Sequence, residues 1–166
     1  MTSTSPDGPP DRQEALRALA RELPNGAVPV PNVITSGQPS AAALERLNGA
    51  GCRTVVDLRG PDEPRGFDEP AVVARLDMTY VSIPVSYNGL GAPEFDRLRE
   101  VLRSAGDASL LLHCASANRV GALLLPYLVL DAGQERETAF ELACAVGLRH
   151  PGLAEAAFRY LDAHAG

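Results

Sequence analysis

Short apolar runs alternate with helix-type patterns along most of the chain. Short apolar and β-branched runs are typical of buried strands, whereas apolar residues spaced three and four apart are typical of amphipathic helices. The pattern predicts strands at 33–34, 53–58, 78–83 and 109–113. It predicts helices at 12–22, 40–49, 68–76, 94–104, 119–130, 134–147 and 152–164. This alternation predicts an α/β fold in three layers, with a mostly parallel sheet of four or five strands flanked by helices.

The N-terminal part divides into two segments. Residues 1–10 (MTSTSPDGPP) are rich in Pro, Ser, Thr and Gly, a composition that predicts a disordered tail. Asp11 is placed to cap the first helix, and Pro24-Asn25-Gly26 would end it. We therefore expect residues 11–31 to form an N-terminal helical extension, and residues 32–166 to form the main domain.

Composition predicts one globular domain. The chain has 166 residues, of which 45% are hydrophobic and 22% charged, values typical of a soluble protein with a sizeable core. No apolar stretch is long enough for a membrane span, and the N-terminus lacks a signal-peptide pattern. The default expectation is a cytoplasmic protein that does not bind membranes.

Charge and cysteine content exclude several function classes. The net charge of −6 argues against a nucleic-acid partner. All 15 basic residues are Arg, which excludes lysine Schiff-base chemistry and a Walker-type phosphate loop. The three cysteines form neither a disulfide framework nor a zinc-type spacing, so we expect no metal and no cofactor.

The segment His113-Cys-Ala-Ser-Ala-Asn-Arg-Val-Gly121 follows a predicted buried strand and precedes a helix. Ligands of open α/β sheets bind at such strand ends. Successive N–H groups in the turn and the helix N-terminus favour an anion and the thiolate form of Cys114. Arg119 can hold two oxygens of that anion with its planar fork. The structural alternative is a buried cysteine beside a helix-capping turn.

Several stretches together resemble a known superfamily. They are VITSGQP at 33–39, GCRTVVDLR at 51–59, Glu63, YVSIPV at 80–85, and HCASANR at 113–119. From about residue 32 to 160, the chain resembles the tyrosine/dual-specificity protein phosphatase superfamily, and within it the beta-lactamase-hydrolase-like, phosphatase-like domains. The resemblance implies a cysteine phosphatase-like fold and hydrolysis of phosphate monoesters through a phosphocysteine intermediate.

The resemblance also implies roles for individual residues. Cys114 would be the nucleophile and Arg119 the oxyanion clamp. His113 would order the loop, and Tyr87 could contact the substrate. The backbone of the loop would cradle the ligand, and further side chains would support it. The loop residues are Ala115, Ser116, Ala117, Asn118 and Val120; the supporting residues are Ser36, Gln38, Arg59 and Glu63.

Three features depart from the superfamily pattern. Four residues separate Cys114 from Arg119, where those phosphatases have five; this shorter spacing resembles rhodanese-type sulfurtransferases. Val120 stands where a Ser or Thr hydroxyl would assist release of the cysteine. The segment 86–92, where the general acid would lie, contains no carboxylate. Glu94 or Asp96 could replace that acid, but each is also an ordinary acid of a helix start.

These departures leave two other functions open. One is a sulfurtransferase that carries a persulfide on Cys114, and the other is a noncatalytic module that binds an oxyanion or a partner protein. The substrate class is accordingly one that bears phosphate, sulfate or sulfur.

Several of these residues also have purely structural interpretations. Asn118 could accommodate an unusual backbone conformation, Tyr87 could anchor its loop, and Arg59 could pair with Glu63 on the surface. Residues assigned structural or surface positions are Cys52, Cys144, His150 and His164.

Overall fold

A five-stranded sheet forms the centre of the computed structural model, which describes residues 11–165. The strands lie in the order β1-β2-β5-β3-β4, and their bounds are β1 Ala27–Val30, β2 Val33–Ser36, β3 Cys52–Asp57, β4 Thr79–Ser82 and β5 Ser109–His113. Strands β2, β5, β3 and β4 run parallel, and β1 is antiparallel to β2. The predicted mostly parallel sheet is confirmed.

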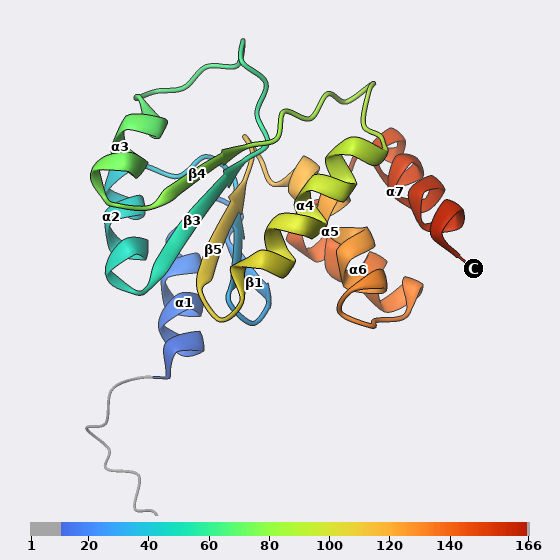
Figure 1. Cartoon of the computed structure of the whole chain (residues 1–166), viewed down its shortest axis with the longest axis horizontal. Helices are drawn as coiled ribbons and strands as arrows, with labels where there is room; N and C mark the ends of the chain where they lie inside the picture. The colour runs from blue at the N-terminus through green and yellow to red at the C-terminus, as the bar shows by residue number, and fades with distance from the viewer. Residues whose placement is uncertain (1–10, 166) are drawn as a thin grey trace, which may run out of the picture.

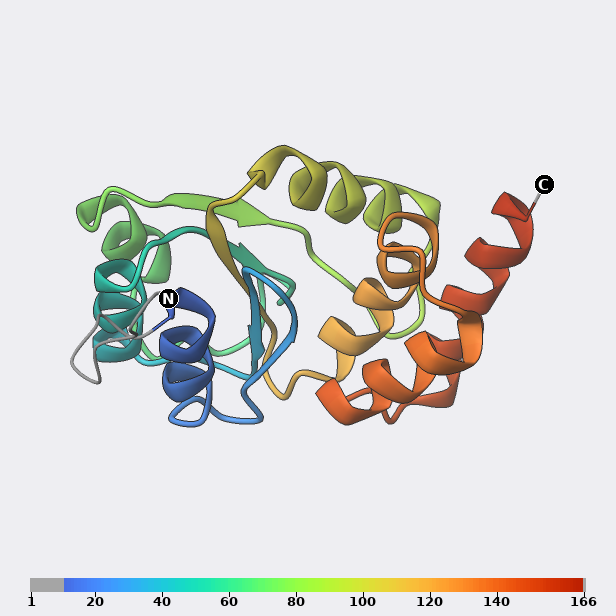
Figure 2. The same ribbon diagram turned by 90° about the horizontal axis from the view of Figure 1, so that it is seen from below.

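Seven helices within residues 11–165 lie on the two sides of this sheet. They are α1 Arg12–Ala20, α2 Ala41–Gly49, α3 Glu69–Arg75, α4 Ala92–Ala105, α5 Asn118–Leu130, α6 Arg136–Val146 and α7 Pro151–His164. Helices α1, α2 and α3 lie on one side and α4 to α7 on the other (Figures 1 and 2). The expected three-layer arrangement is confirmed. No helix in the described part of the chain is both long and apolar enough to span a bilayer.

Alternate residues of the central strand supply the two cores. Leu111 packs with α1, α2 and α3, whereas Leu110 and Leu112 pack with the helices of the other side. All three side chains are at most 1% exposed. A strand covered on both faces is apolar throughout, which is why a continuous apolar run marked it in the sequence.

The segment after α1 differs from the expected helical extension. Residues 27–30 form the edge strand β1, and Asn32, with φ 69°, turns the chain into β2. Pro29 lies inside β1, a position that an edge strand tolerates because one side of its backbone has no strand partner. Gln13 of α1 accepts from the backbone N–H of Asn32 at 3.0 Å and donates to its side chain at 2.7 Å. The helix and the edge strand are therefore built onto the sheet together. The predicted tail at 1–10 lies outside the described residues.

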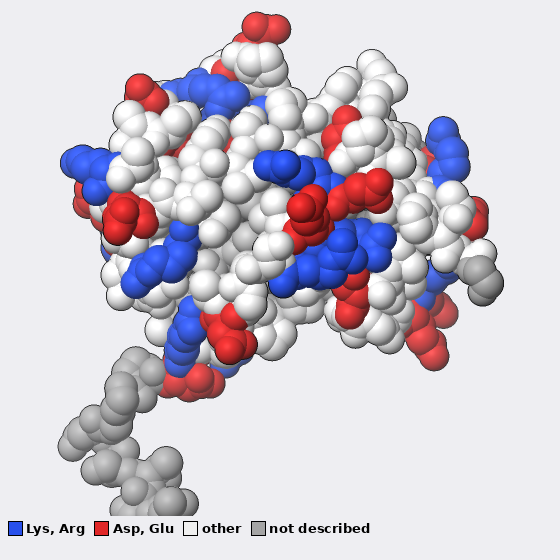
Figure 3. All heavy atoms as spheres, in the orientation of Figure 1, with Lys and Arg blue, Asp and Glu red and all other residues white. Residues whose placement is uncertain are grey.

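Most helix starts follow from local chemistry. Asp11 and Ser40 cap α1 and α2 as expected, each accepting a backbone N–H with its side chain. Helix α4 begins at Ala92, two residues before the predicted start, because Glu94 reaches back to accept the N–H of Gly91. Basic and acidic side chains are interspersed over α4, as Figure 3 shows for this face of the molecule.

The carboxyl ends of β3, β4 and β5 meet at one edge of the sheet, at the top of Figure 1. Segments 58–68, 83–91 and 114–117 leave the strands there. Three connecting segments that are distant in sequence are thus brought to a single edge.

Helix α5 packs tightly against α6 and the residues that follow it at Gly121. A β-carbon there would lie 2.6 Å from the carbonyl oxygen of Ala143 and 2.9 Å from the β-carbon of Leu148. Because both neighbours belong to the packed core, neither can move away without cost. This contact sets the position of α5, whose first turn carries Arg119.

We expect Gly121→Ala to destabilise the protein by about 1–3 kcal/mol, because the added methyl overpacks this contact. Gly49→Ala is the matched control: nothing lies within 4 Å of its β-carbon position, so its stability should stay equal or rise by at most about 1 kcal/mol. Urea unfolding of the two variants measures the difference. Equal effects would show that the α5–α6 contact is not tight.

Candidate active site

The turn between β5 and α5 holds Cys114 at its base. Cys114 is buried, whereas Ala115 and Ser116 are exposed. Ala117 adopts the left-handed conformation, with φ 69°. This conformation turns its backbone N–H back to donate to Sγ of Cys114 at 3.1 Å.

Arg119 projects from the first turn of α5 and is held end-on by Glu63. Its Nη1 and Nη2 each donate to a Glu63 oxygen at 2.7 Å, and Nη1 also donates to the carbonyl oxygen of Val85 at 3.3 Å. Nε is buried and has no hydrogen-bond partner within residues 11–165. A guanidinium has five N–H donors, so the side-on edge formed by Nε and Nη2 remains available to two oxygens of an anion.

The Arg119–Glu63 pair fixes the charge of both groups. Hydrogen bonds from Arg119 lower the pKa of Glu63, against the opposing effect of burial. Hydrogen bonds to Glu63 raise the pKa of Arg119 above its ordinary value. Each group therefore favours the charged form of the other.

Aromatic rings border the clamp. The Tyr87 ring lies 5.2 Å from the guanidinium carbon of Arg119, and the His150 ring meets Tyr87 edge-on at 5.1 Å. A hollow of about 460 Å³ beside them is lined by Gly60, Pro61, Glu63, Pro84, Val85, Ser86, Tyr87, Asn88 and Arg119. Tyr87 is thus both an anchor of its loop and a wall of this hollow.

Asn118 acts on the neighbouring turn and not as the residue of unusual conformation. Its Oδ1 accepts the backbone N–H groups of Arg149 and His150 at 2.8 and 3.1 Å. The residue in the left-handed conformation is instead Ala117. Gly147 packs against it so closely that a β-carbon on Gly147 would lie 2.8 Å from the carbonyl oxygen of Ala117. The suggestion that Asn118 accommodates the strained backbone is wrong, because that residue already starts the helix.

Three residues outside the loop hydrogen-bond to its backbone. The N–H of Gln38 donates to the carbonyl of Ala115 at 3.2 Å, and Nδ2 of Asn25 donates to that of Ser116 at 3.2 Å. Ser36 is buried, donates its hydroxyl to the carbonyl of Gly37, and accepts the Cys114 N–H at its own carbonyl. Sequence reasoning missed Asn25, whose only signal was its place in a turn.

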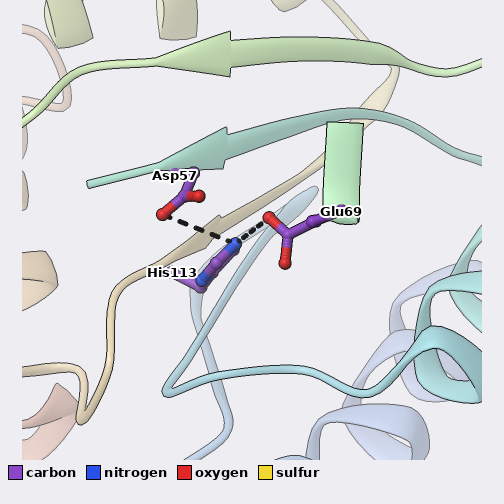
Figure 4. Close-up of side chains that lie close together, drawn as sticks. All are labelled: Asp57, Glu69 and His113. Carbon is purple, nitrogen blue, oxygen red and sulfur yellow. Dashed lines mark hydrogen bonds and ion pairs between the residues drawn. The ribbon is translucent and has the colours of Figure 1, made fainter. Parts of the chain in front are cut away.

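A buried charge network lies beneath the loop. Asp57 and His113 are the last residues of neighbouring strands and lie in register. Glu69, on α3, places its Oε2 2.7 Å from Nε2 of His113 (Figure 4). Asp57 accepts from Arg59 at 2.9 and 3.0 Å, and from Tyr80 at 2.6 Å. Arg65 donates to the same carboxylate at 2.7 Å. These contacts join β3, β4, β5 and α3 at the edge that carries the loop.

The hydrogen bonds of this network determine the ionisation of Asp57. Burial by itself disfavours the carboxylate, but the Arg59 hydrogen bonds, the His113 charge and the Tyr80 hydroxyl together hold the pKa of Asp57 well below its usual range. Asp57, Glu69 and His113 lie close enough to hold a cation. Their oxygens, however, already accept N–H and O–H donors, and two guanidiniums add positive charge, so the cluster is a poor metal site.

The alternative of a surface pair between Arg59 and Glu63 is wrong. Arg59 is 1% exposed and pairs with Asp57. The end of β3 places the Asp57 carboxylate beside the backbone N–H of Arg59, which donates to it. Glu63 pairs with Arg119, a residue 56 positions away. Sequence reasoning assigned no role to four residues of the network: Asp57, Arg65, Glu69 and Tyr80. The available signal for Asp57 was a carboxylate at the end of a parallel strand.

The remaining candidates have structural contacts. Val120, named with the loop, is fully buried in the core. Glu94 caps α4, and Asp96 accepts the Tyr160 hydroxyl. His150 caps α7, although its contact with Tyr87 brings it to the site, and His164 stacks on Tyr160. Among the cysteines, burial raises the pKa of Cys52 to about 11, and Cys144 is half-buried.

No family model and no curated protein matches the sequence. Solved structures do. A DUF442 protein from Shewanella putrefaciens CN-32, assigned as a candidate phosphatase, is 18% identical with a TM-score of 0.72, over 85% of this chain and 91% of its own. Pseudomonas aeruginosa TpbA, solved with phosphotyrosine, is 20% identical with a TM-score of 0.66 over 83% of each chain. Tk-PTP in its active form is 14% identical with a TM-score of 0.69, over 84% of this chain and 95% of its own.

These likenesses establish the fold. The chain has the α/β fold of tyrosine and dual-specificity phosphatase-like proteins. Its place in the beta-lactamase-hydrolase-like branch stays a prediction.

We expect Asp57→Asn to cost about 3–5 kcal/mol of stability at pH 7, because it leaves Arg59 buried without its partner. The folded-state pKa of Asp57 is depressed, so its contribution is complete above the unfolded pKa of about 4 and is lost as the pH falls below it. The difference in unfolding free energy between wild type and Asp57→Asn should therefore narrow by up to about 1.4 kcal/mol per pH unit below pH 4.

Urea unfolding at pH 7 and pH 3 measures the unfolding free energies of wild type and Asp57→Asn. Exposed Asp62, in the same segment, provides the control: Asp62→Asn should change stability by less than about 0.5 kcal/mol at both pH values. A difference for Asp57→Asn that is the same at pH 7 and pH 3 would contradict the assigned ionisation.

Proposed function

We propose that the chain is a cysteine-dependent, phosphatase-like hydrolase of phosphate monoesters. The observation that carries this proposal is the state of Arg119: Glu63 holds it end-on, and its buried Nε has no hydrogen-bond partner in the described chain. Cys114 and Arg119 lie at the two ends of one short turn, so both can reach an anion bound there. Tetrahedral oxyanions match this combination of fork, loop N–H groups and nucleophile.

The proposed reaction has two steps. The Cys114 thiolate attacks phosphorus, an S–P bond forms, and the P–O bond to the leaving group breaks with its electron pair on oxygen. Water then attacks phosphorus, the S–P bond breaks, and inorganic phosphate leaves with the thiolate restored. Arg119 and the loop N–H groups stabilise the charge that develops on the phosphoryl oxygens.

Proton donation to the leaving group is the weak point of this site. Segment 86–92 has no carboxylate, and both Glu94 and Asp96 are engaged in structural hydrogen bonds. A general acid typically contributes about 10²–10⁴-fold. We therefore expect turnover of activated aryl phosphates, whose leaving groups need no proton, and little turnover of alkyl esters. An aryl phosphate is also the ligand named for TpbA, which was solved with phosphotyrosine.

The short loop favours a second candidate. With only four residues between Cys114 and Arg119, a sulfur atom on Cys114 would fit a smaller arc than a phosphoryl group needs, and sulfur transfer requires no general acid. In that reaction Cys114 takes a sulfane sulfur from a donor such as thiosulfate, releasing sulfite, and passes it to a thiol or cyanide.

Hydrolysis of p-nitrophenyl phosphate by wild type and by Cys114→Ser tests the proposal. We expect turnover in wild type and a fall of about 10³-fold or more in the variant, because the covalent nucleophile is lost. Cys144→Ser is the matched control, since half-buried Cys144 belongs to α6 and should leave turnover unchanged.

No turnover in wild type would contradict the phosphatase assignment. Thiosulfate treatment followed by mass spectrometry then decides the second candidate: a mass gain of one sulfur atom on Cys114 supports it, and an unmodified Cys114 rejects it.

We expect Arg119→Lys to weaken phosphate binding about 10- to 100-fold, because a point charge replaces a two-pronged donor worth about 1.5–3 kcal/mol. Exposed Arg97 on α4 supplies the charge-preserving control, Arg97→Lys, which should bind phosphate as wild type does. Calorimetric titration with inorganic phosphate measures both. Equal affinity in wild type and Arg119→Lys would remove Arg119 from the clamp role.

A further inference from the structure

Glu69 is a fully buried carboxylate to which neither the motif nor the proposed reaction assigns a role. It is the first residue of α3, and its two oxygens face different segments of the chain. Oε2 lies 2.7 Å from Nε2 of His113, and Oε1 accepts from Nε2 of Gln38 at 3.1 Å. Arg59 approaches Oε1 at 3.6 Å and provides the countercharge.

Both partners of Glu69, His113 and Gln38, also contact the backbone of the Cys114 loop. The other ring nitrogen of His113, Nδ1, lies 3.3 Å from the carbonyl oxygen of Cys114. The backbone N–H of Gln38 donates to the carbonyl oxygen of Ala115 at 3.2 Å. Two routes from one carboxylate therefore end on two successive carbonyls of the loop.

Holding those carbonyls also aims the loop N–H groups. A trans peptide is planar, so its C=O and N–H point in opposite directions. When the Cys114 carbonyl faces His113, the N–H of Ala115 points away from the buried network. When the Ala115 carbonyl faces Gln38, the N–H of Ser116 does the same. Both N–H groups therefore point away from the network, and they belong to the two exposed residues of the loop.

We propose that Glu69 is a positioning residue that orients the N–H groups of Ala115 and Ser116 toward the bound oxyanion, through His113 and Gln38. The inference rests on the proposed function for the identity of the anion. The geometry itself is a property of the ligand-free protein. Glu69 touches neither the anion nor the nucleophile.

The choice of residue follows from acceptor counting. A carboxylate can accept from His113 and Gln38 at the same time, one at each oxygen. An amide at this position has a single oxygen, which can accept from His113 or from Gln38, so it keeps one of the two contacts. Glu69→Gln is therefore the conservative variant, and Glu69→Ala removes both contacts.

The experiment compares Glu69→Ala, Glu69→Gln and a control of equal kind, Asp131→Ala. Asp131 pairs with Arg99 at the far end of α5, about 20 Å along the helix from the loop. All three variants lose or weaken an ion pair that is at least half-buried, so a purely structural effect would be common to Glu69→Ala and Asp131→Ala. The measurements are the melting temperature, the affinity for inorganic phosphate, and the backbone amide chemical shifts of Ala115 and Ser116 in ligand-free protein.

We expect Glu69→Ala to bind phosphate at least about tenfold more weakly and to shift both amides. Glu69→Gln should recover affinity to within about threefold, and Asp131→Ala should lower only the melting temperature. If Glu69→Ala keeps phosphate affinity within twofold of wild type with both amides unmoved, the proposal is overturned.

A second variant covers the case in which Glu69→Ala does not fold. Gln38→Ala removes the side-chain hydrogen bond to Glu69 and leaves the backbone N–H that holds the Ala115 carbonyl without this anchor, so the Ser116 amide should shift while that of Ala115 stays in place. If neither amide moves, the proposal is overturned. The amide shifts need no bound anion, so a wild-type protein that failed to bind phosphate would reject the proposed function without deciding the role of Glu69.

Discussion

Two carboxylates with no exposure to water, Asp57 and Glu69, place the strongest constraint on this structure. A buried charge is costly unless it is paired and fully hydrogen-bonded, so every neighbour of these groups must be in place at once. Their partners come from the ends of β3 and β5, from β4 and from the segment before α3. The network therefore closes only when the parallel strands are in register, and it fixes the edge of the sheet from which the Cys114 loop departs.

The loop itself is short and is shaped largely from outside. The left-handed Ala117, the close passage of Gly147 and the hydrogen bonds from Asn25 and Gln38 hold its carbonyls away from the site. Glu63 orients Arg119 in a similar way from outside the loop. It accepts from both terminal nitrogens of the guanidinium and leaves Nε without a partner in the described chain. Neighbouring segments thus shape the ligand-binding side and leave the chemistry to a few loop groups.

As the site of the proposed hydrolase, this edge has groups to bind an anion and attack it, but none in the described chain placed to protonate the leaving group. Fork, loop N–H groups and thiol are all present, whereas the acids nearest in sequence are tied to helix α4 and to Tyr160. A hydrolase built this way depends on the leaving group for the proton-demanding step. A sulfur carrier would not, and this is the physical reason that the two candidate functions differ in their demands on the same six residues from Cys114 to Arg119.

The sequence by itself determined the order of elements, the parallel sheet and the position of the Cys114–Arg119 turn. Apolar runs such as 109–113 and caps such as Asp11 and Ser40 are local signals, and the alternation of strand and helix leaves few topologies. Tertiary structure alone decided that residues 27–30 add an edge strand and that Glu63 serves Arg119 while Arg59 serves Asp57. It also decided that Glu69 reaches His113 across 44 positions. Charges of one sign look alike in a sequence, and only the packing of distant segments selects which of them meet, because pairing depends on burial and direction, neither of which a local pattern carries.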